Sequence, residues 1–73
     1  MFEKFVQLLV SDFNIRESEI TKEAELIRDL GFNSIELADL VMRCEEIYEV
    51  EISEDDASSF VTVGDVVNYL EQL

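Results

Sequence analysis

The chain has 73 residues, of which 48% are hydrophobic and 32% charged, and its 18 acidic and 5 basic residues give a net charge of −13. This charge argues against nucleic acid and anionic membranes as partners, and no segment approaches the ~20 apolar residues of a membrane span. The single cysteine, Cys44, excludes an internal disulfide, and without a signal-like segment we expect a cytoplasmic location.

A helix is predicted at the N-terminus, because apolar residues recur there at helical spacing. They share one face: Phe2, Val6, Leu9 and Phe13, with Phe5 beside them. We expect Asn14 to end this helix.

Residues 15–33 allow two interpretations. Thr21 is a suitable cap for a short helix over 22–30, with Gly31 as its end. The apolar residues of this segment are, however, spaced like contacts that hold a long loop to a core: Ile15, Ile20, Leu26, Ile27, Leu30 and Phe32. Local rules favour the short helix, since a structureless loop of this length is unusual in a compact domain.

The clearest helix is predicted from Ser34 to about Glu49. Asn33 is a good N-cap, and Glu36 stands three residues later, as a capping box requires. Ser34 is then the first helical residue, at the positive end of the helix dipole, beside unpaired N–H groups that tolerate a phosphate. The side predicted to face the core is apolar: Leu37, Leu40, Val41, Cys44, Ile47 and Tyr48. Cys44 is therefore expected to be an inert, buried thiol.

A second apolar strip lies on the opposite side of this helix, where Ile35, Ala38 and Met42 are expected to be exposed. Single exposed apolar residues are common in soluble proteins. A strip with an acidic rim, however, suits docking to a partner that is basic around an apolar patch. The expected partner contacts are Ile35, Glu36, Ala38, Asp39, Met42 and Glu46.

Two more elements are predicted toward the C-terminus. Val50 and Ile52 lead inward, and Ser53 begins a short turn over 54–59. Thr62 is the expected cap of a last helix, with Asp65 three residues later. Its buried stripe is predicted to contain Val63, Val66, Val67, Leu70 and Leu73. We therefore expect residues 1–73 to form a single all-α domain, a small four-helix bundle of three longer helices and a short third one.

Enzymatic chemistry is not expected. The chain has no histidine, and neither Ser34 nor Cys44 has a basic residue nearby in the sequence that could act as its partner. No metal site is predicted either. Glu54, Asp55 and Asp56 lack the alternating acids, the glycine and the final glutamate of a calcium-binding loop.

The order of these motifs resembles that of acyl carrier proteins over almost the whole chain. Residues 26–34, LIRDLGFNS, are similar to the family's approach to its modified serine, and residues 62–70, TVGDVVNYL, to its last helix. The resemblance implies a long loop with one helical turn between helices 1 and 2, and we adopt it for residues 15–33. It also implies that a phosphopantetheinyl transferase moves 4′-phosphopantetheine from coenzyme A to Ser34. The thiol of that group then holds acyl chains as thioesters for acyl-processing enzymes with basic docking patches.

Two residues depart from the family's pattern. Asn33 stands where the family usually has aspartate, and Arg43 interrupts the acidic rim. The last helix favours a carrier of fatty acid biosynthesis, which we expect, whereas Asn33 favours a specialised polyketide or nonribosomal peptide pathway. A further alternative is an acidic helical adaptor without a prosthetic group. That role would leave the turn before Ser34 unexplained. We expect the protein to act as a monomer.

Overall fold

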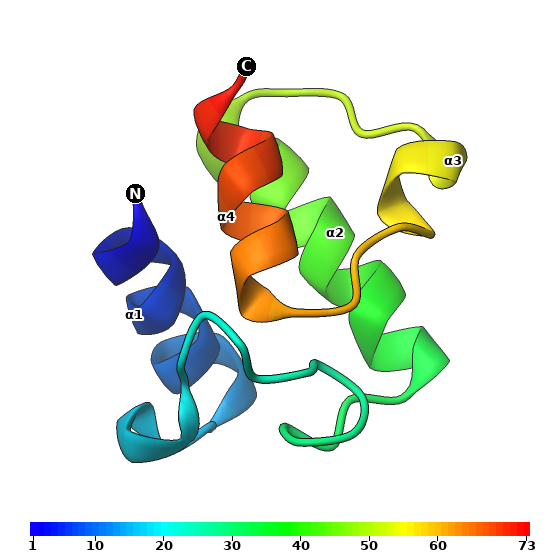
Figure 1. Ribbon diagram of the computed structural model, residues 1–73. Coiled ribbons are helices and arrows are strands. Elements are labelled where there is room, and N and C mark those ends of the chain that lie inside the picture. The colour runs from blue at the N-terminus through cyan, green and yellow to red at the C-terminus, as the bar shows by residue number, and fades with distance from the viewer.

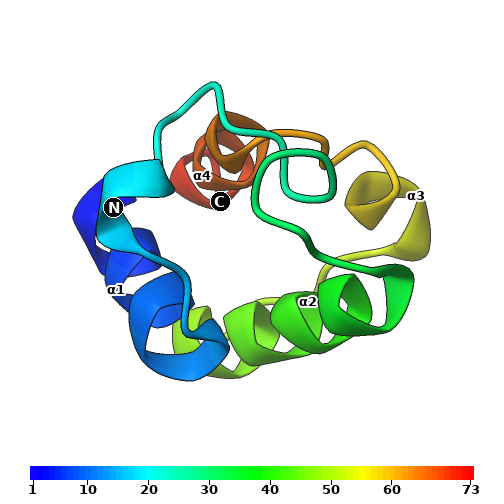
Figure 2. The same cartoon turned by 90° about the horizontal axis from the view of Figure 1, so that it is seen from below.

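The computed structural model describes all 73 residues and contains α-helices, one 3-10 helix and no strand. The elements are α1 (Phe2–Phe13), η1 (Glu17–Glu19), α2 (Ser34–Tyr48), α3 (Glu54–Ala57) and α4 (Val63–Glu71). Helices α1 and α3 lie on opposite sides of the molecule, with α2 and α4 between them (Figures 1 and 2). The predicted bundle of three longer helices and a short third one is therefore confirmed. None of the helices combines the length and the apolar character needed to cross a membrane.

The ends of the helices lie where their capping residues predict. Asn14 closes α1 with a left-handed backbone at φ 57°. Thr62 and Asp65 form a capping box at the start of α4, and the Asp65 carboxylate accepts the N–H groups of Val61 and Thr62, each at 3.0 Å. These bonds stabilise the charged form and lower the pKa of Asp65. Ser53 caps α3 by accepting the Asp56 N–H at 3.1 Å.

The segment between α1 and α2 is a loop whose only helical turn is η1, as the family resemblance implies and the local rules do not. Its backbone forms turns of its own and is also paired with residues 61–64 at the start of α4. Leu26 N–H donates to the Val61 carbonyl, Val63 N–H to the Ala24 carbonyl and Gly64 N–H to the Lys22 carbonyl, each at 2.9 Å. The first N–H groups of a helix have no acceptor within it, so the loop supplies acceptors for α4. This pairing takes the place of the helix over 22–30.

The core is formed by one apolar cluster to which α1, α2 and α4 contribute buried residues, whereas η1 and α3 contribute none. Loop residues fill a large part of it: Ile20, Ala24, Leu26, Leu30 and Phe32. Most predicted stripe residues of the helices are buried or half-buried, including Leu40 and Cys44 of α2 and Val63, Val66, Val67 and Leu70 of α4.

Three residues that were expected in the core are exposed instead, and each expectation was wrong for a local reason. Ile27 is 58% exposed because residues 26–30 form a turn in which Leu26 and Leu30, four residues apart, face inward. Ile47 is 43% exposed because the buried and half-buried residues of α2 extend from Leu40 through Cys44 to Val41. Ile47 lies at the edge of this arc, about 20° beyond Leu40 and about 60° from Cys44 around the helix. Leu73 is 63% exposed because α4 ends at Glu71.

Candidate functional site

The predicted capping box at the start of α2 is present. Asn33 has an extended backbone, and its side-chain oxygen accepts the Glu36 N–H at 2.7 Å. In return, the Glu36 carboxylate accepts the Asn33 N–H at 3.2 Å. Both side chains are thus held by the helix end, and Ser34 is its first residue.

The chain reaches Ser34 through a turn that needs a glycine. Gly31 has φ 78°, and open space surrounds the position of a Cβ atom there, so the backbone angle alone favours glycine. The next residue, Phe32, is 4% exposed, and its ring lies 5.2 Å from that of Phe13 of α1. Phe32 N–H also donates to the Leu26 carbonyl at 3.0 Å. The start of α2 is therefore fixed to the core on its inner side.

The outer side of this helix end is open. Ser34 is exposed, and its hydroxyl makes no hydrogen bond within the protein. The N–H groups of Ser34 and Ile35 have no protein acceptor either, whereas those of Glu36 and Leu37 are bonded to Asn33. Two free amides at the positive pole of a 15-residue helix fit a negatively charged phosphate ester on the hydroxyl.

The other five serines offer a contrast. The hydroxyl of Ser11 donates to the Gln7 carbonyl, and those of Ser58 and Ser59 donate to the carbonyls of Asp55 and Asp56. Ser53 is a helix cap. Apart from Ser34, only Ser18 in η1 has a hydroxyl without a partner, and η1 has only three residues. Ser34 is thus the one serine whose free hydroxyl begins a long helix.

The residues predicted to contact a partner lie together on the solvent side of α2. Ile35 is 80% exposed and Met42 58%, and Glu36, Ala38, Asp39 and Glu46 are also exposed. We call these six residues the α2 face. On the other side of the helix, Leu40 and Cys44 are buried. Burial raises the pKa of the Cys44 thiol to about 12, so the thiol is protonated at neutral pH and unreactive.

Sequence reasoning did not find the ion pairs beside the α2 face. Arg43 contacts Asp39 at 3.3 Å and Asp12 of α1 at 3.1 Å. Both carboxylates raise the pKa of Arg43. The spacing of four residues between Asp39 and Arg43 is a readable signal on a helix. The contact with Asp12, 31 residues away in the sequence, has no such signal.

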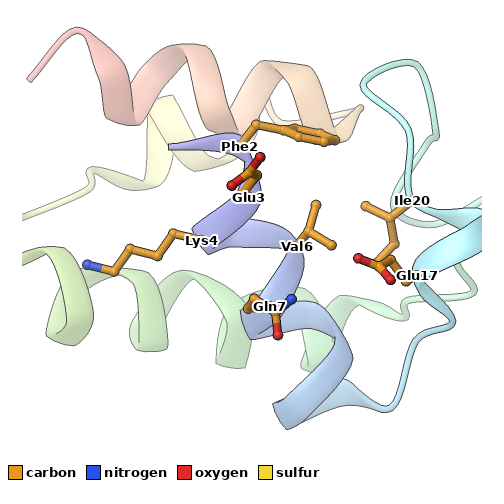
Figure 3. Close-up of a pocket in the computed structure, with 7 residues that line it drawn as sticks. All are labelled: Phe2, Glu3, Lys4, Val6, Gln7, Glu17 and Ile20. Atoms are coloured by element: carbon orange, nitrogen blue, oxygen red, sulfur yellow. The ribbon is translucent and has the colours of Figure 1, made fainter.

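Three of the hollows on the molecule are relevant to the site. One of about 450 Å³ lies at the start of α1 and is lined by residues of α1 and η1 with Ile20, and by none of α2 (Figure 3). A groove of about 450 Å³ lies between α2 and α3. Beside it is a small cavity of about 30 Å³ lined only by apolar residues, including Leu40, Cys44 and Phe60. No group of acidic, histidine or cysteine side chains is arranged so that it could hold a metal ion.

Comparison with known proteins agrees with this geometry. Residues 3–70 match the family described as "Phosphopantetheine attachment site". Proteins named "Acyl carrier protein" from three strains of Clostridium perfringens are each 42% identical to the chain over 72 residues, which is 99% of this chain and 95% of the relative. The chain therefore belongs to the acyl carrier protein family, whose members carry covalently attached 4′-phosphopantetheine.

Proposed function

We propose that Ser34 is the residue that carries 4′-phosphopantetheine, and that the protein presents acyl groups to successive enzymes of fatty acid biosynthesis. The observation that supports this most directly is the free Ser34 hydroxyl beside two free amides at the start of α2. When bound, the group supplies a thiol that holds acyl chains as thioesters.

The attachment step needs only a nucleophile from this chain. The Ser34 hydroxyl loses its proton and its Oγ forms a bond to the phosphorus of coenzyme A that bears the pantetheine arm. The bond from that phosphorus to the adenosine 3′,5′-bisphosphate part breaks, and this part leaves. We place the base that removes the proton on the transferase, since the chain has no histidine, the commonest general base. The chain acts here as a substrate and afterwards as a carrier, not as a catalyst.

The α2 face is the proposed contact surface for the transferase and the acyl-processing enzymes. Ile35 directly follows the serine, so a partner that binds this face also reaches the group on Ser34. The exposed apolar strip of Ile35, Ala38 and Met42 offers area to bury, and Glu36, Asp39 and Glu46 surround it with negative charge. Complementary basic patches on the partners would accelerate association and fix its orientation.

The pathway is proposed from the resemblance of the last helix to carriers of fatty acid biosynthesis. Asn33 favours the second candidate, a specialised polyketide or nonribosomal peptide pathway. In this structure Asn33 caps α2 through its side-chain oxygen, as aspartate would, so the substitution removes a charge and keeps the helix end. The functions of the neighbouring genes would decide between the two pathways.

The attachment site is tested with Ser34→Ala. The apo-protein is incubated with coenzyme A and a broad-specificity phosphopantetheinyl transferase, and its intact mass is measured. We expect one added group on the wild type and none on Ser34→Ala. The variant should melt within a few degrees of the wild type, because Asn33 supplies the cap.

The matched control is Ser18→Ala, which removes the other hydroxyl without a partner and should leave the modification complete. Modification of Ser34→Ala at any other serine would overturn the assignment. A wild type that no transferase modifies would favour the adaptor without a prosthetic group.

A further inference from the structure

Arg43 is the only basic residue of α2, and it lies between the α2 face and α1. Its Nε donates to the Asp39 carboxylate at 3.3 Å, and its Nη1 donates to the Asp12 carboxylate at 3.1 Å. The guanidinium also lies over the Phe13 ring, 5.5 Å from its centroid. These contacts hold one cation at a defined position on the α1 side of the face.

The contacts of Arg43 change the charge that a basic partner encounters on the α1 side of the α2 face. Asp39 belongs to the α2 face, but its charge is shared with Arg43, and Asp12 faces the same cation. The side chains of Arg43 and Asp39 are 44% and 50% exposed, so a partner's lysine or arginine near Asp39 also approaches Arg43. Two like charges at 4 Å repel by about 1 kcal/mol even in water. Arg43, Asp39 and Asp12 together carry a net charge of −1, so the α1 side of the face attracts a basic partner less than its two carboxylates alone would.

The α3 side of the same helix has the opposite character. Residues 44–73 contain nine acidic residues and no basic one, and no ion pair of the structure involves any of them. The groove between α2 and α3 belongs to this side. Its lining includes Ala38, Met42 and Ala57 together with Glu54 and Glu45, and one carboxylate oxygen of Glu45 accepts the Ile52 N–H at 2.8 Å. It is thus an apolar groove with negative charge contributed by both helices.

We propose that Arg43 is a specificity-determining residue, which directs basic partner proteins toward the α3 side of α2 and away from the α1 side. The occupant of the groove is an apolar side chain of the partner with lysine or arginine beside it, paired to Glu45 and Glu54. This inference rests on the proposed function, because the partner is an enzyme that docks on α2 to reach Ser34.

The proposal is tested with the apo-protein, coenzyme A and a phosphopantetheinyl transferase at low ionic strength. Calorimetry measures the Kd of the protein–transferase complex, and mass spectrometry measures the KM of loading. We expect Arg43→Gln to lower both about two- to fivefold, the factor that corresponds to one exposed charge pair. Arg43→Lys keeps the cation but has one ammonium in place of Nε and Nη1, so its Kd and KM should lie between those of the wild type and Arg43→Gln.

The control for net charge is Lys22→Gln. It changes the net charge from −13 to −14, as Arg43→Gln does, but Lys22 lies over the Phe2 ring at the start of α1. We expect it to change Kd by less than about twofold, because screening confines the effect of an exposed charge to its surroundings.

A double-mutant cycle tests the part played by Asp39. Asp39→Asn should raise Kd less in the wild type than in the Arg43→Gln background, because Arg43 is paired with this carboxylate in the wild type. In the Arg43→Gln background it should raise Kd about two- to fivefold, since the carboxylate is then free to pair with the partner. Glu54→Gln should raise Kd in both backgrounds.

Two results would overturn the proposal and are distinguishable. If Ser34 is loaded but Arg43→Gln leaves Kd and KM unchanged, or matches Lys22→Gln, the role of Arg43 is wrong and the proposed function stands. If the transferase loads neither the wild type nor any variant, the proposed function fails, and the inference fails with it.

Discussion

Cys44 and Met42 show how sharply the environment of a residue changes around α2. They are two residues apart, yet Cys44 is 1% exposed and Met42 is 58% exposed. Residue type does not explain this difference in exposure, because both side chains contain sulfur and are apolar or weakly polar. Their position relative to the core decides the cost of a charge at each, and this makes the rotation of α2 testable.

A glutamate should impair partner docking at position 42 and protein stability at position 44. Met42→Glu should change the free energy of unfolding by about 0.5 kcal/mol or less, as exposed substitutions do. It should nevertheless raise the KM of transferase loading, because it places a charge in an apolar contact. Cys44→Glu should lower the free energy of unfolding by more than about 2 kcal/mol, because it buries a carboxylate without a partner. Thermal melts and loading rates measure both.

Met42→Gln serves as the control that separates the introduced charge from the lost methionine. Its KM should lie between those of the wild type and Met42→Glu. If Met42→Glu unfolds the protein and Cys44→Glu does not, α2 is rotated relative to the structure and the α2 face is wrong.

At the scale of the elements, the helix caps depend on residues close together in the sequence and could be predicted. The structure of the loop between α1 and α2 depends on long-range contacts and could not. The capping boxes at Asn33 and Thr62 each involve residues within one helical turn, so they are readable from the sequence. The loop before α2 is not, because its carbonyls bond to N–H groups of α4 about 40 residues away, and local propensity contains no information on that pairing. The groove with Glu54 and the contact of Arg43 with Asp12 escaped prediction for the same reason.

Gly64 lies where the loop and α4 touch, and Gly64→Ala tests that contact. Its N–H donates to the Lys22 carbonyl at 2.9 Å, and a Cβ atom would lie 3.0 Å from the same oxygen. Alanine gains about 0.5–1 kcal/mol of helix propensity over glycine, whereas overpacking costs about 1–3 kcal/mol. We expect net destabilisation of about 1 kcal/mol in urea unfolding. Hydrogen exchange of the Leu26 and Val63 amides should also accelerate.

Asn68→Ala is the matched control, because Asn68 is exposed on the same helix. It should stabilise the protein by a few tenths of a kcal/mol through propensity alone. If Gly64→Ala stabilises the protein as Asn68→Ala does, the loop yields without cost and its pairing with α4 is not a constraint.

For the whole molecule, charge and size act together. The net charge of −13 is confined to a globule with a radius of gyration of 11.0 Å and a longest extent of 28 Å. The Debye length is about 30 Å at 0.01 M salt and about 8 Å at 0.15 M. At the lower concentration every acidic residue therefore repels every other, whereas at the higher one only neighbours do. Unfolding relieves this repulsion, because it moves the charges apart.

Added salt should therefore raise the melting temperature. The three ion pairs of the structure are all on the surface and oppose this trend, but each exposed pair contributes only about 0–1 kcal/mol. Repulsion among an excess of 13 negative charges is the larger effect. Calorimetric melts between 0.01 and about 0.2 M sodium chloride should show a rise that levels off as the Debye length falls below the size of the molecule. Magnesium chloride should act at lower concentration because its cation is divalent.

A midpoint that does not move over this range would show that the acidic residues repel one another less than their number implies. A rise that continues in proportion to concentration toward 1 M would point to exclusion of salt from the surface instead of screening.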